Sequence, residues 1–336
     1  MVTIKDVAKV AGVSIATVSR VIHNGHQVGD ACRARVKKVI EELGYRPNSN
    51  ARALVSKTTN TLGVVTPKLS MPFFGSLASG AEKAARENNY KLLMSNSLYE
   101  TRSEQEAIDS LRDHNCQAII LHSEYSDEKT LLKLAEEIPG LVLINRYIPS
   151  LAHRCVWLDN IAGARQSADY LLQKGHRTFA VVTSIYQNGD PGFRLQGIRE
   201  SLKLAGLSLP ESAVEESTAN IEGGEQAVKA LLAKGCKFTA LLAYNDLMAI
   251  GAIHALFAAG LRVPEDVSVI GFDDLIVSRA CRPQLTTMHY PVEEMASYAA
   301  QLAISLSDNS QKQQYRTHLF IPNLVERDSV ATAVIS

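Results

Sequence analysis

Two different spacings of apolar residues divide the chain at about residue 60. Before that point, apolar positions recur every three or four residues, which is typical of amphipathic helices. After it, short apolar runs alternate with helical patterns, which is typical of parallel sheets with helices on both faces. The pattern therefore predicts a small all-α head followed by a larger α/β body.

The head begins with two short helices. Thr3 and Asp6 have the spacing of a capping box, and Gly12 ends the helix that they start. Ser14 is a suitable N-cap for a second helix over residues 15–22. Two short helices joined by a turn that contains glycine indicate a helix-turn-helix.

A third helix is predicted over residues 30–43, with one apolar face and one face rich in Lys and Arg. A short segment that can form a helix follows at 48–55, and then a polar linker. The predicted domains are a head at 1–46, a hinge helix and linker at 47–61, and a body at 62–336.

The body contains too many predicted strands for one sheet of ordinary size. We therefore predict two doubly wound lobes with a ligand site between them, at the carboxyl ends of the strands. The predicted strands are 62–66, 92–94, 118–121, 141–144, 156–158, 179–182, 240–243 and 267–272. The predicted helices include 75–88, 103–114, 161–174, 192–205, 223–233 and 246–259. The N-lobe should comprise about 62–160 plus 291–320, and the C-lobe about 161–290 plus 321–336.

Charge is distributed unevenly although the whole chain is neutral. Residues 1–60 hold ten Lys and Arg against four Asp and Glu, whereas the remainder holds 25 against 31. The head therefore carries a net charge of +6 and the body −6. A basic head on an acidic body is typical of a nucleic-acid-binding domain joined to another function.

The five cysteines favour no zinc site and no disulfide framework, because they are far apart and form no CxxC pair. Cys116, His114 and His122 are close in sequence, but no clear acid orients a histidine, so we interpret all three as ordinary packing or surface residues. No P-loop and no GxGxxG after the first strand of the body is present, so the sequence predicts neither an enzyme nor a cofactor. Without a signal peptide or an apolar run of membrane-spanning length, we expect a cytoplasmic protein.

A helix-turn-helix places its second helix in the major groove. Ser14, Thr17 and Ser19 can then bind phosphates, and Arg20 can pair with guanine. The alternative is a generic helical hairpin with Arg20 in solvent.

The segment 6–21 fits the pattern DVAxxAGVSxATVSRV, and GYRPN at 44–48 and NARAL at 50–54 follow it. With these motifs the chain resembles the lactose/galactose repressor family of transcription regulators. The resemblance implies that Ile15 and Ala16 help to choose the operator sequence. His23 departs from the family, which commonly has Asn there. The implied DNA-binding residues are Thr3, Ser14, Ile15, Ala16, Thr17, Ser19, Arg20, His23, Asn50, Arg52 and Leu54.

In that family, the segment that corresponds to 48–55 is a hinge helix that folds on operator DNA. The resemblance implies that Leu54 is inserted into the minor groove, where an apolar side chain can kink the duplex. The alternative is that Leu54 packs against the body of the protein.

The resemblance covers nearly the whole chain and is strongest to the galactose subgroup. Its segments in the body are PFFG at 72–75, VLINR at 142–146, AHRC at 152–155, LDN at 158–160, RLQG at 194–197, GGEQA at 223–227, YND at 244–246, IGFDD at 270–274 and LTT at 285–287. A sugar needs polar partners for its hydroxyls and aromatic rings for its apolar face. The implied effector-binding residues are Phe73, Phe74, Asn145, Arg146, Arg194, Asn245, Asp273 and Tyr290.

Each of these residues also has a structural alternative. Asn245 could only be the N-cap of the helix that starts at 246, and Asp273 could cap the next segment. Phe73 and Phe74 could be core residues, and Arg194 could lie on a helix surface. Two positions depart from common family patterns: Met71 replaces a polar residue, and Tyr290 replaces Gln, although the galactose subgroup has Tyr-Pro there.

We therefore expect a homodimeric repressor that binds a palindromic operator and is released by a monosaccharide, with D-galactose the expected inducer. Only residues 331–336 follow the last segment that resembles the family, so we expect no leucine-rich tetramerisation helix. Three other classes of protein would show different features. A periplasmic sugar-binding protein would lack the basic head. A corepressor-type regulator would bind DNA more tightly with its ligand. An α/β enzyme would need catalytic motifs.

Overall fold

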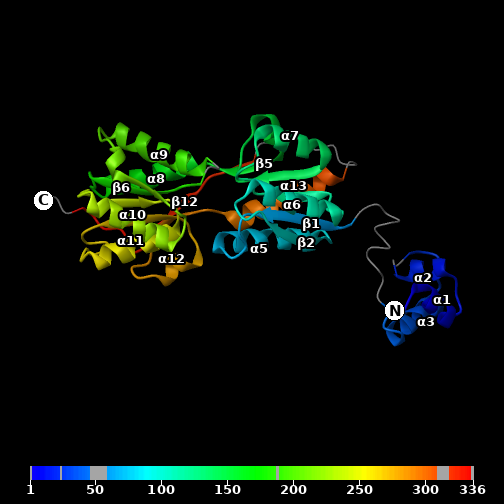
Figure 1. Cartoon of the computed structure of the whole chain (residues 1–336). Helices are drawn as coiled ribbons and strands as arrows, with labels where there is room; N and C mark the ends of the chain where they lie inside the picture. The colour runs from blue at the N-terminus through cyan, green and yellow to red at the C-terminus, as the bar shows by residue number, and fades with distance from the viewer. Residues whose placement is uncertain (1, 23–24, 46–58, 187–188, 309–317, 334–336) are drawn as a thin grey trace. The chain divides into compact units, whose positions relative to one another are not determined.

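The computed structural model describes residues 2–22, 25–45, 59–186, 189–308 and 318–333. The chain divides into two compact units, Met1–Thr59 and Asn60–Ser336 (Figure 1). The predicted hinge helix at 48–55 lies outside the described residues, as do His23, Asn50, Arg52 and Leu54.

The head consists of α1 (Ile4–Ala11), α2 (Ile15–Ile22) and α3 (Asp30–Glu42). The predicted capping box is present, because Thr3 Oγ1 accepts from the Asp6 amide and the Asp6 carboxylate accepts from the Thr3 amide. Gly12 ends α1 with a φ of 64°, in the left-handed region. Apolar side chains from all three helices, Val7, Val18, Val21 and Val36 among them, form one small core.

The N-lobe is built on a six-stranded parallel sheet with the order β11-β5-β4-β3-β1-β2. Its strands are β1 (Thr61–Thr66), β2 (Lys91–Asn96), β3 (Ala118–Leu121), β4 (Gly140–Ile144), β5 (Cys155–Leu158) and β11 (His318–Phe320). Its helices are α5 (Pro72–Glu87), α6 (Thr101–Asp113), α7 (Glu128–Glu137), the 3-10 helix η1 (Pro149–Arg154) and α13 (Val292–Ser307). The cores show that α5 and α13 cover one face of the sheet, and α6 and α7 cover the other.

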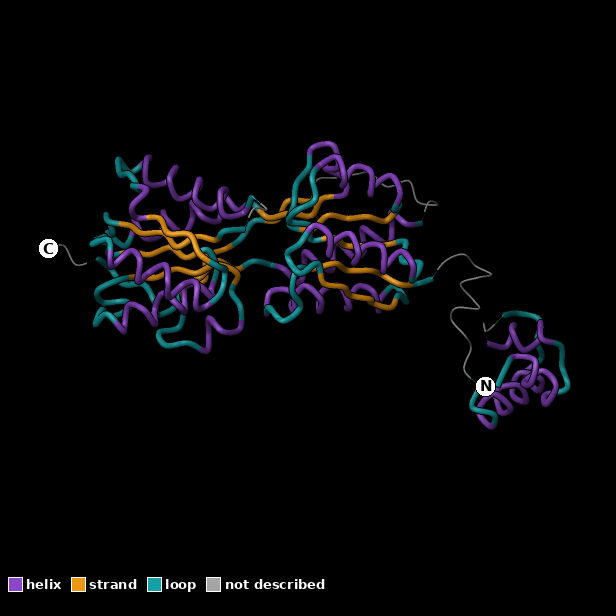
Figure 2. Tube along the Cα trace, viewed as in Figure 1, coloured by secondary structure: helices purple, strands orange, loops and turns teal. Residues whose placement is uncertain are grey.

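The C-lobe has a second six-stranded sheet, with the order β12-β10-β9-β8-β6-β7. Figure 2 shows the strands of each lobe in orange, with purple helices on both sides of them. Its strands are β6 (Phe179–Ser184), β7 (Val214–Ser217), β8 (Ala240–Ala243), β9 (Ser268–Asp273), β10 (Thr286–His289) and β12 (Asn323–Val325). Its helices are α8 (Asn160–Gln173), α9 (Asp190–Leu204), the 3-10 helix η2 (Glu211–Ala213), α10 (Ile221–Ala233), α11 (Asp246–Ala258) and α12 (Ile276–Ala280). Here α10 and α11 cover one face, and α8 and α9 cover the other.

The fold class predicted from the sequence, a helical head and a two-lobed α/β body, is confirmed. One strand departs from the prediction of purely parallel sheets, because β12 runs antiparallel to β10. The reason is the short connection between β11 and β12. The chain leaves the N-lobe at Phe320 and enters the C-lobe at Asn323, with no crossover that could reverse its direction.

The chain passes between the lobes three times, so neither lobe is continuous in sequence. The chain crosses from one lobe to the other between β5 and α8, between β10 and α13, and between β11 and β12. Residues that come at or just after the ends of parallel strands in both lobes line one cavity, so residues that follow different strands meet between the lobes.

Helices α8 and α9 pack closely on one face of the C-lobe sheet. The approach requires glycine at position 197, because a Cβ there would overlap the carbonyl oxygen of Ile161. By contrast, a Cβ at Gly192, on the same helix, would meet nothing within 4 Å. The contact fixes the position of α9, which carries Arg194 into the space between the lobes.

Candidate functional site

The second helix of the head presents a polar and partly apolar face to solvent. Val18 and Val21 are buried and hold α2 against α1 and α3, whereas Ile15, Ala16 and Arg20 are exposed. Ile15 is 45 % exposed, which is high for an isoleucine in a domain with so small a core. The helix is thus fixed by one face and free to meet a groove with the other.

Hydrogen bonds define the start of α2. Ser14 Oγ accepts from the Thr17 amide at 3.1 Å and lies 2.9 Å from Thr17 Oγ1, so the predicted N-cap is present. Ser19 is half-buried on the same helix, and Thr3 is exposed at the start of α1. Six predicted DNA-binding residues, Ser14, Ile15, Ala16, Thr17, Ser19 and Arg20, therefore lie on or directly before one helix.

A cavity of about 50 Å³, the inner cleft, lies between the two lobes of the body. The residues that line it come from both lobes and from the β10–α13 passage. They are Met71, Phe73, Phe74, Tyr99, His122, Glu124, Asn145, Tyr186, Asp190, Arg194, Tyr244, Asn245, Asp273 and Tyr290. Seven of the eight predicted effector residues are among them.

Arg146 is the exception, because it does not line the inner cleft in this lobe arrangement. Its Nη1 donates to the Ser123 hydroxyl oxygen, 3.3 Å away. Asn145, which comes directly after β4 and has a φ of 59°, does line the cleft.

Arg194 is buried, contrary to the alternative of a helix-surface position. Its Nε donates to Asn160 Oδ1 at 2.8 Å, and Nη1 donates to the Tyr244 carbonyl oxygen. The guanidinium carbon lies 3.7 Å from the centre of the Phe272 ring and 4.5 Å from that of Tyr244. Stacking and hydrogen bonds therefore hold a planar cation with fixed donors at the cleft.

A chain of buried hydrogen bonds joins the lobes beside Arg194. Tyr290 Oη donates to Asn145 Oδ1 at 2.5 Å, and Asn145 Nδ2 donates to Asp190 Oδ2 at 2.6 Å. Asn160 Nδ2 donates to Asp190 Oδ1 at 3.0 Å. Since Asn145 belongs to the N-lobe and Asp190 to the C-lobe, their hydrogen bond depends on the present lobe arrangement.

Asp273 and Asn245 lie at the carboxyl ends of neighbouring strands of the C-lobe. Asn245 caps α11, because its Oδ1 accepts from the Met248 amide at 2.9 Å, and it also lines the cleft. Asp273, the last residue of β9, has a φ of 112°, and no described residue donates a hydrogen bond to its carboxylate. Burial raises the pKa of Asp273 to about 7, although Arg194 opposes this effect.

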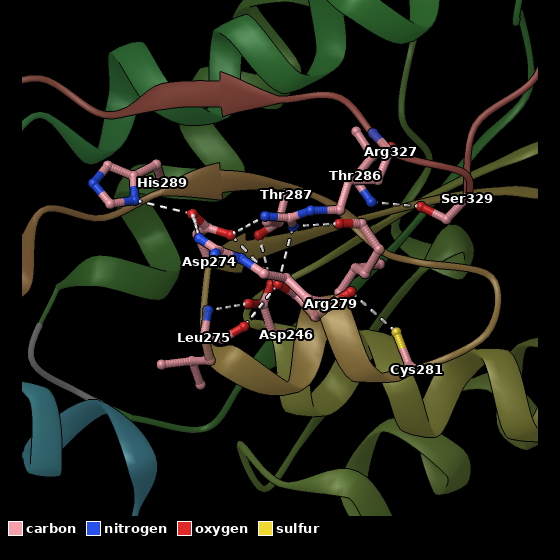
Figure 3. A network of polar contacts seen from close by, with 12 residues as sticks. Asp246, Asp274, Leu275, Arg279, Cys281, Thr286, Thr287, His289, Arg327 and Ser329 are labelled. Carbon is pink, nitrogen blue, oxygen red and sulfur yellow. Dashed lines mark hydrogen bonds and ion pairs between the residues drawn. The ribbon is translucent and has the colours of Figure 1, made fainter.

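A polar network holds the backbone that presents Asp273 (Figure 3). Asp274 pairs with Arg327 and lies 3.1 Å from His289 Nδ1, while Asp246 accepts from the Leu275 amide at 2.7 Å and from Thr287 Oγ1 at 2.5 Å. Burial raises the pKa of Asp274, but the contacts from Arg327 and His289 outweigh it and lower the pKa below its usual value. The network thus fixes the loop after β9 from β10, from the start of α11 and from the segment after β12.

Several residues that line the cleft were missed by the sequence analysis. The rings of Tyr99 and Tyr186 stack across the lobes at 5.2 Å, with their hydroxyl oxygens 3.0 Å apart. His122 was predicted to be an ordinary packing or surface residue. It packs edge-on against Phe74 and also lines the cleft. The signal that could have found Tyr99, His122 and Tyr186 is their position just after strands β2, β3 and β6.

Glu124 is the most unusual of these residues. Its Oε2 is buried without a hydrogen-bond partner among the described residues, and the same holds for His122 Nδ1, which lies 3.9 Å from Glu124 Oε1. Burial, with Asp190 and Glu104 nearby, raises the pKa of Glu124 to about 8. Burial lowers the pKa of His122 to about 4. Both side chains are thus favoured in their neutral forms.

Within the part of the chain that the structure describes, no group of three or more His, Cys, Asp or Glu is arranged to hold a metal ion. The five cysteines are free thiols. Among the same residues, no helix is both long enough and apolar enough to cross a membrane.

These features define a class, that of DNA-binding regulators with a helix-turn-helix head and a two-lobed ligand-binding body. Residues 3–48 match the family described as bacterial regulatory proteins, lacI family, and residues 168–330 match a periplasmic binding protein-like domain. The chain is 42 % identical to the HTH-type transcriptional regulator GalR of Escherichia coli K12, over 99 % of this chain and 96 % of GalR. It is 41 % identical to the regulator GalS of Salmonella typhimurium LT2, over 98 % of this chain and 97 % of GalS.

Solved structures agree with this relationship. The lac repressor dimer bound to operator and the anti-inducer ONPF has a TM-score of 0.87 at 25 % identity, over 98 % of this chain and 99 % of that chain. A complex of the transcriptional regulator CelR with cellobiose has a TM-score of 0.73 at 30 % identity, over 98 % and 100 %. The chain belongs to the lacI family of bacterial regulatory proteins, and it is a DNA-binding, sugar-responsive repressor.

Proposed function

We propose that D-galactose is the effector of this repressor and releases it from operator DNA. The observation that carries the proposal is the inner cleft, where both lobes contribute polar groups and aromatic rings to one cavity. Hydroxyls of a sugar can donate to Asp273 and accept from Arg194, and its apolar face can lie against Phe73 or Tyr290. Similarity over the whole chain to GalR and GalS supports galactose among the sugars.

We assign the effector contacts to Phe73, Phe74, Asn145, Arg194, Asn245, Asp273 and Tyr290. The cleft of about 50 Å³ is smaller than the roughly 300–1,000 Å³ of typical ligand pockets. A monosaccharide therefore needs the lobes or the side chains to move apart. A sugar that binds one lobe arrangement better than the other shifts the population between them.

We assign operator contacts to α2 and to the residues before it, with Thr3, Ser14, Thr17 and Ser19 on phosphates, and Ile15, Ala16 and Arg20 on base edges. By family resemblance, His23, Asn50, Arg52 and Leu54 complete this set. The active form is a homodimer, because two heads match the two halves of a palindromic operator. It acts in the cytoplasm and has no enzymatic activity. Genes for galactose uptake and metabolism are the proposed targets.

The test is operator binding by the purified full-length protein on a palindromic operator from a galactose operon, at one fixed salt concentration. We expect D-galactose to weaken binding by about 5–150-fold, the range of ordinary allosteric coupling energies. D-Glucose serves as the epimer control. Unchanged binding would remove galactose as the effector, and tighter binding would show a corepressor.

A further inference from the structure

A second and larger cavity lies between the lobes, on the other side of the Asn145–Asp190 hydrogen bond. This outer pocket has a volume of about 210 Å³. It is lined by Asn145, Arg146, Tyr147, Trp157, Leu158, Asp159, Asn160, Ile161, Gly189, Asp190 and Phe193. It shares only Asn145 and Asp190 with the inner cleft, so it is a separate compartment in this lobe arrangement.

Aromatic rings from both lobes line the outer pocket. In the N-lobe, Tyr147 stacks on Trp157 with ring centres 4.6 Å apart and an interplanar angle of 30°. Phe193 comes from α9 of the C-lobe. Tyr147 is 42 % and Phe193 48 % exposed, although large aromatic residues are usually covered in a folded body. The pocket therefore offers uncovered ring surface at a junction between lobes.

The polar part of the lining is buried. Asp190 and Asn160 are 4 % and 5 % exposed and are bonded to each other. The Trp157 Nε1–H group is buried and has no acceptor among the described residues. Because this nitrogen is closed to solvent, a ligand in the pocket does not reach it, and the buried polar groups that line the pocket are those of Asn160 and Asp190.

The charges of the lining disfavour an anionic ligand. Among the residues that line the pocket, one is a cation, Arg146, and two carry carboxyl groups, Asp159 and Asp190, while Arg146 already donates to Ser123. A ligand with many hydroxyls and an apolar ring face fits exposed aromatic rings beside buried amide and carboxyl groups.

We propose that the outer pocket is a second ligand site that binds one neutral pyranose ring, stacked between the Tyr147–Trp157 pair and Phe193. Because these residues come from both lobes, a sugar bound there stabilises the lobe arrangement of this structure. The Asn145–Asp190 hydrogen bond forms a wall common to both cavities, so occupancy of one couples to that of the other. This inference goes beyond the proposed function and does not depend on galactose being the effector.

The chain provides its own reporter, since Trp157 is its only tryptophan. The full-length protein is titrated with D-galactose, D-glucose and D-xylose, with tryptophan emission and binding heat as the readouts. Asp273→Asn impairs the inner cleft alone, because Asp273 does not line the outer pocket. We expect at least one of these sugars to change Trp157 emission saturably in Asp273→Asn.

The matched variants lie on α9. Phe193→Ala in the Asp273→Asn background should weaken this binding at least tenfold. Leu204→Ala serves as the control, because Leu204 is 84 % exposed at the far end of the helix. Tyr147→Ala tests the other wall of the pocket if Phe193→Ala fails to fold.

The inference is overturned if no sugar gives saturable emission change or heat in Asp273→Asn, or if the two pocket variants bind as the Leu204→Ala control does. Failure of the proposed function looks different. In that case galactose leaves operator binding of the wild type unchanged, while the titration of Asp273→Asn still saturates.

Discussion

Arg194 is a residue whose removal should affect effector binding but not DNA binding. It lies in the body, and its contacts are to Asn160, Tyr244 and Phe272. We expect Arg194→Ala to bind operator DNA as the wild type does when galactose is absent. Galactose should then cause little or none of the decrease in operator affinity that it causes in the wild type. Operator titrations with and without galactose measure both quantities.

The matched control is Arg199→Ala, which also removes a cation from α9. The described partner of Arg199 is Glu211, and neither residue lines the cleft. Circular dichroism of both variants shows whether the body remains folded. A normal galactose response in folded Arg194→Ala would contradict the assignment of the inner cleft.

Glu124 makes the stability of the body depend on pH. Its pKa is raised to about 8 in the folded chain, against a usual value of 4.5. Between these values the unfolded chain releases the proton and the folded chain keeps it, so stability falls as pH rises through this window. The slope from one such group is at most about 1.4 kcal/mol per pH unit.

Glu124→Gln should therefore lose less stability than the wild type between pH 6.5 and pH 8. His122 does not contribute in this pH range. Because its pKa is lowered to about 4, it destabilises the folded body only as pH falls from 6.5 towards 4. Asp273 contributes a similar loss as pH rises through about 7, and it is present in both proteins. Urea midpoints at several pH values give the comparison, and parallel curves would refute a buried neutral Glu124.

The cleft residues that the sequence predicted are polar groups at the ends of strands with clear apolar runs. Asn145 comes directly after β4, Asn245 comes two residues after β8, and Asp273 is the last residue of β9. Glu124, Tyr99 and Asp190 were missed, because their chemistry depends on which loops meet across the lobes. The sequence also could not separate Asn145 from its neighbour Arg146, of which only Asn145 lines the inner cleft.

Among the elements, the helices with clear periodicity were predicted within a few residues, and α2 was predicted with the bounds that it has. The strands β7, β10, β11 and β12 were not predicted, and the helices α7, α12 and α13 were not among those named. The sequences of these four strands, VEES, TTMH, HLF and NLV, contain polar residues and so lack the continuous apolar runs that indicated the other strands. Both β11 and β12 lie at the edges of their sheets.

The contact between α8 and α9 gives a prediction at this scale. Gly197→Ala places a Cβ against the Ile161 carbonyl oxygen, so we expect a loss of about 1–3 kcal/mol in the stability of the body. Gly192→Ala, where the Cβ has room, should be neutral or stabilise by up to about 1 kcal/mol through helix propensity. Denaturation midpoints by circular dichroism compare them, and equal midpoints would exclude close packing at Gly197.

In the molecule as a whole, the last segment of the chain contacts and stabilises the loop after β9, which lies well before it in the sequence. Arg327 pairs with Asp274, and both side chains are at least nine-tenths buried. Arg327→Met removes the only buried cation described beside Asp274 and leaves its carboxylate with His289 and the exposed Arg279, and breaking a buried pair typically costs about 3–5 kcal/mol. We expect thermal unfolding of the body at a clearly lower temperature.

Arg279→Met is the control for this prediction. Arg279 lies 3.7 Å from the same carboxylate, but its side chain is 62 % exposed, so its loss should cost less than about 1 kcal/mol. Adding Asp274→Asn to Arg327→Met should recover part of the loss. Equal effects of Arg279→Met and Arg327→Met would show that burial does not decide the strength of this network.

The third passage between the lobes has a consequence for how the protein is made. The head ends near residue 45, whereas β11 and β12, which complete the edges of the two body sheets, begin at His318 and Asn323. At a synthesis rate of ~5–20 residues per second, roughly 15–55 s separate these events on the ribosome. A growing chain therefore carries a complete DNA-reading head for much of its synthesis, while both halves of its sensing body still lack a strand.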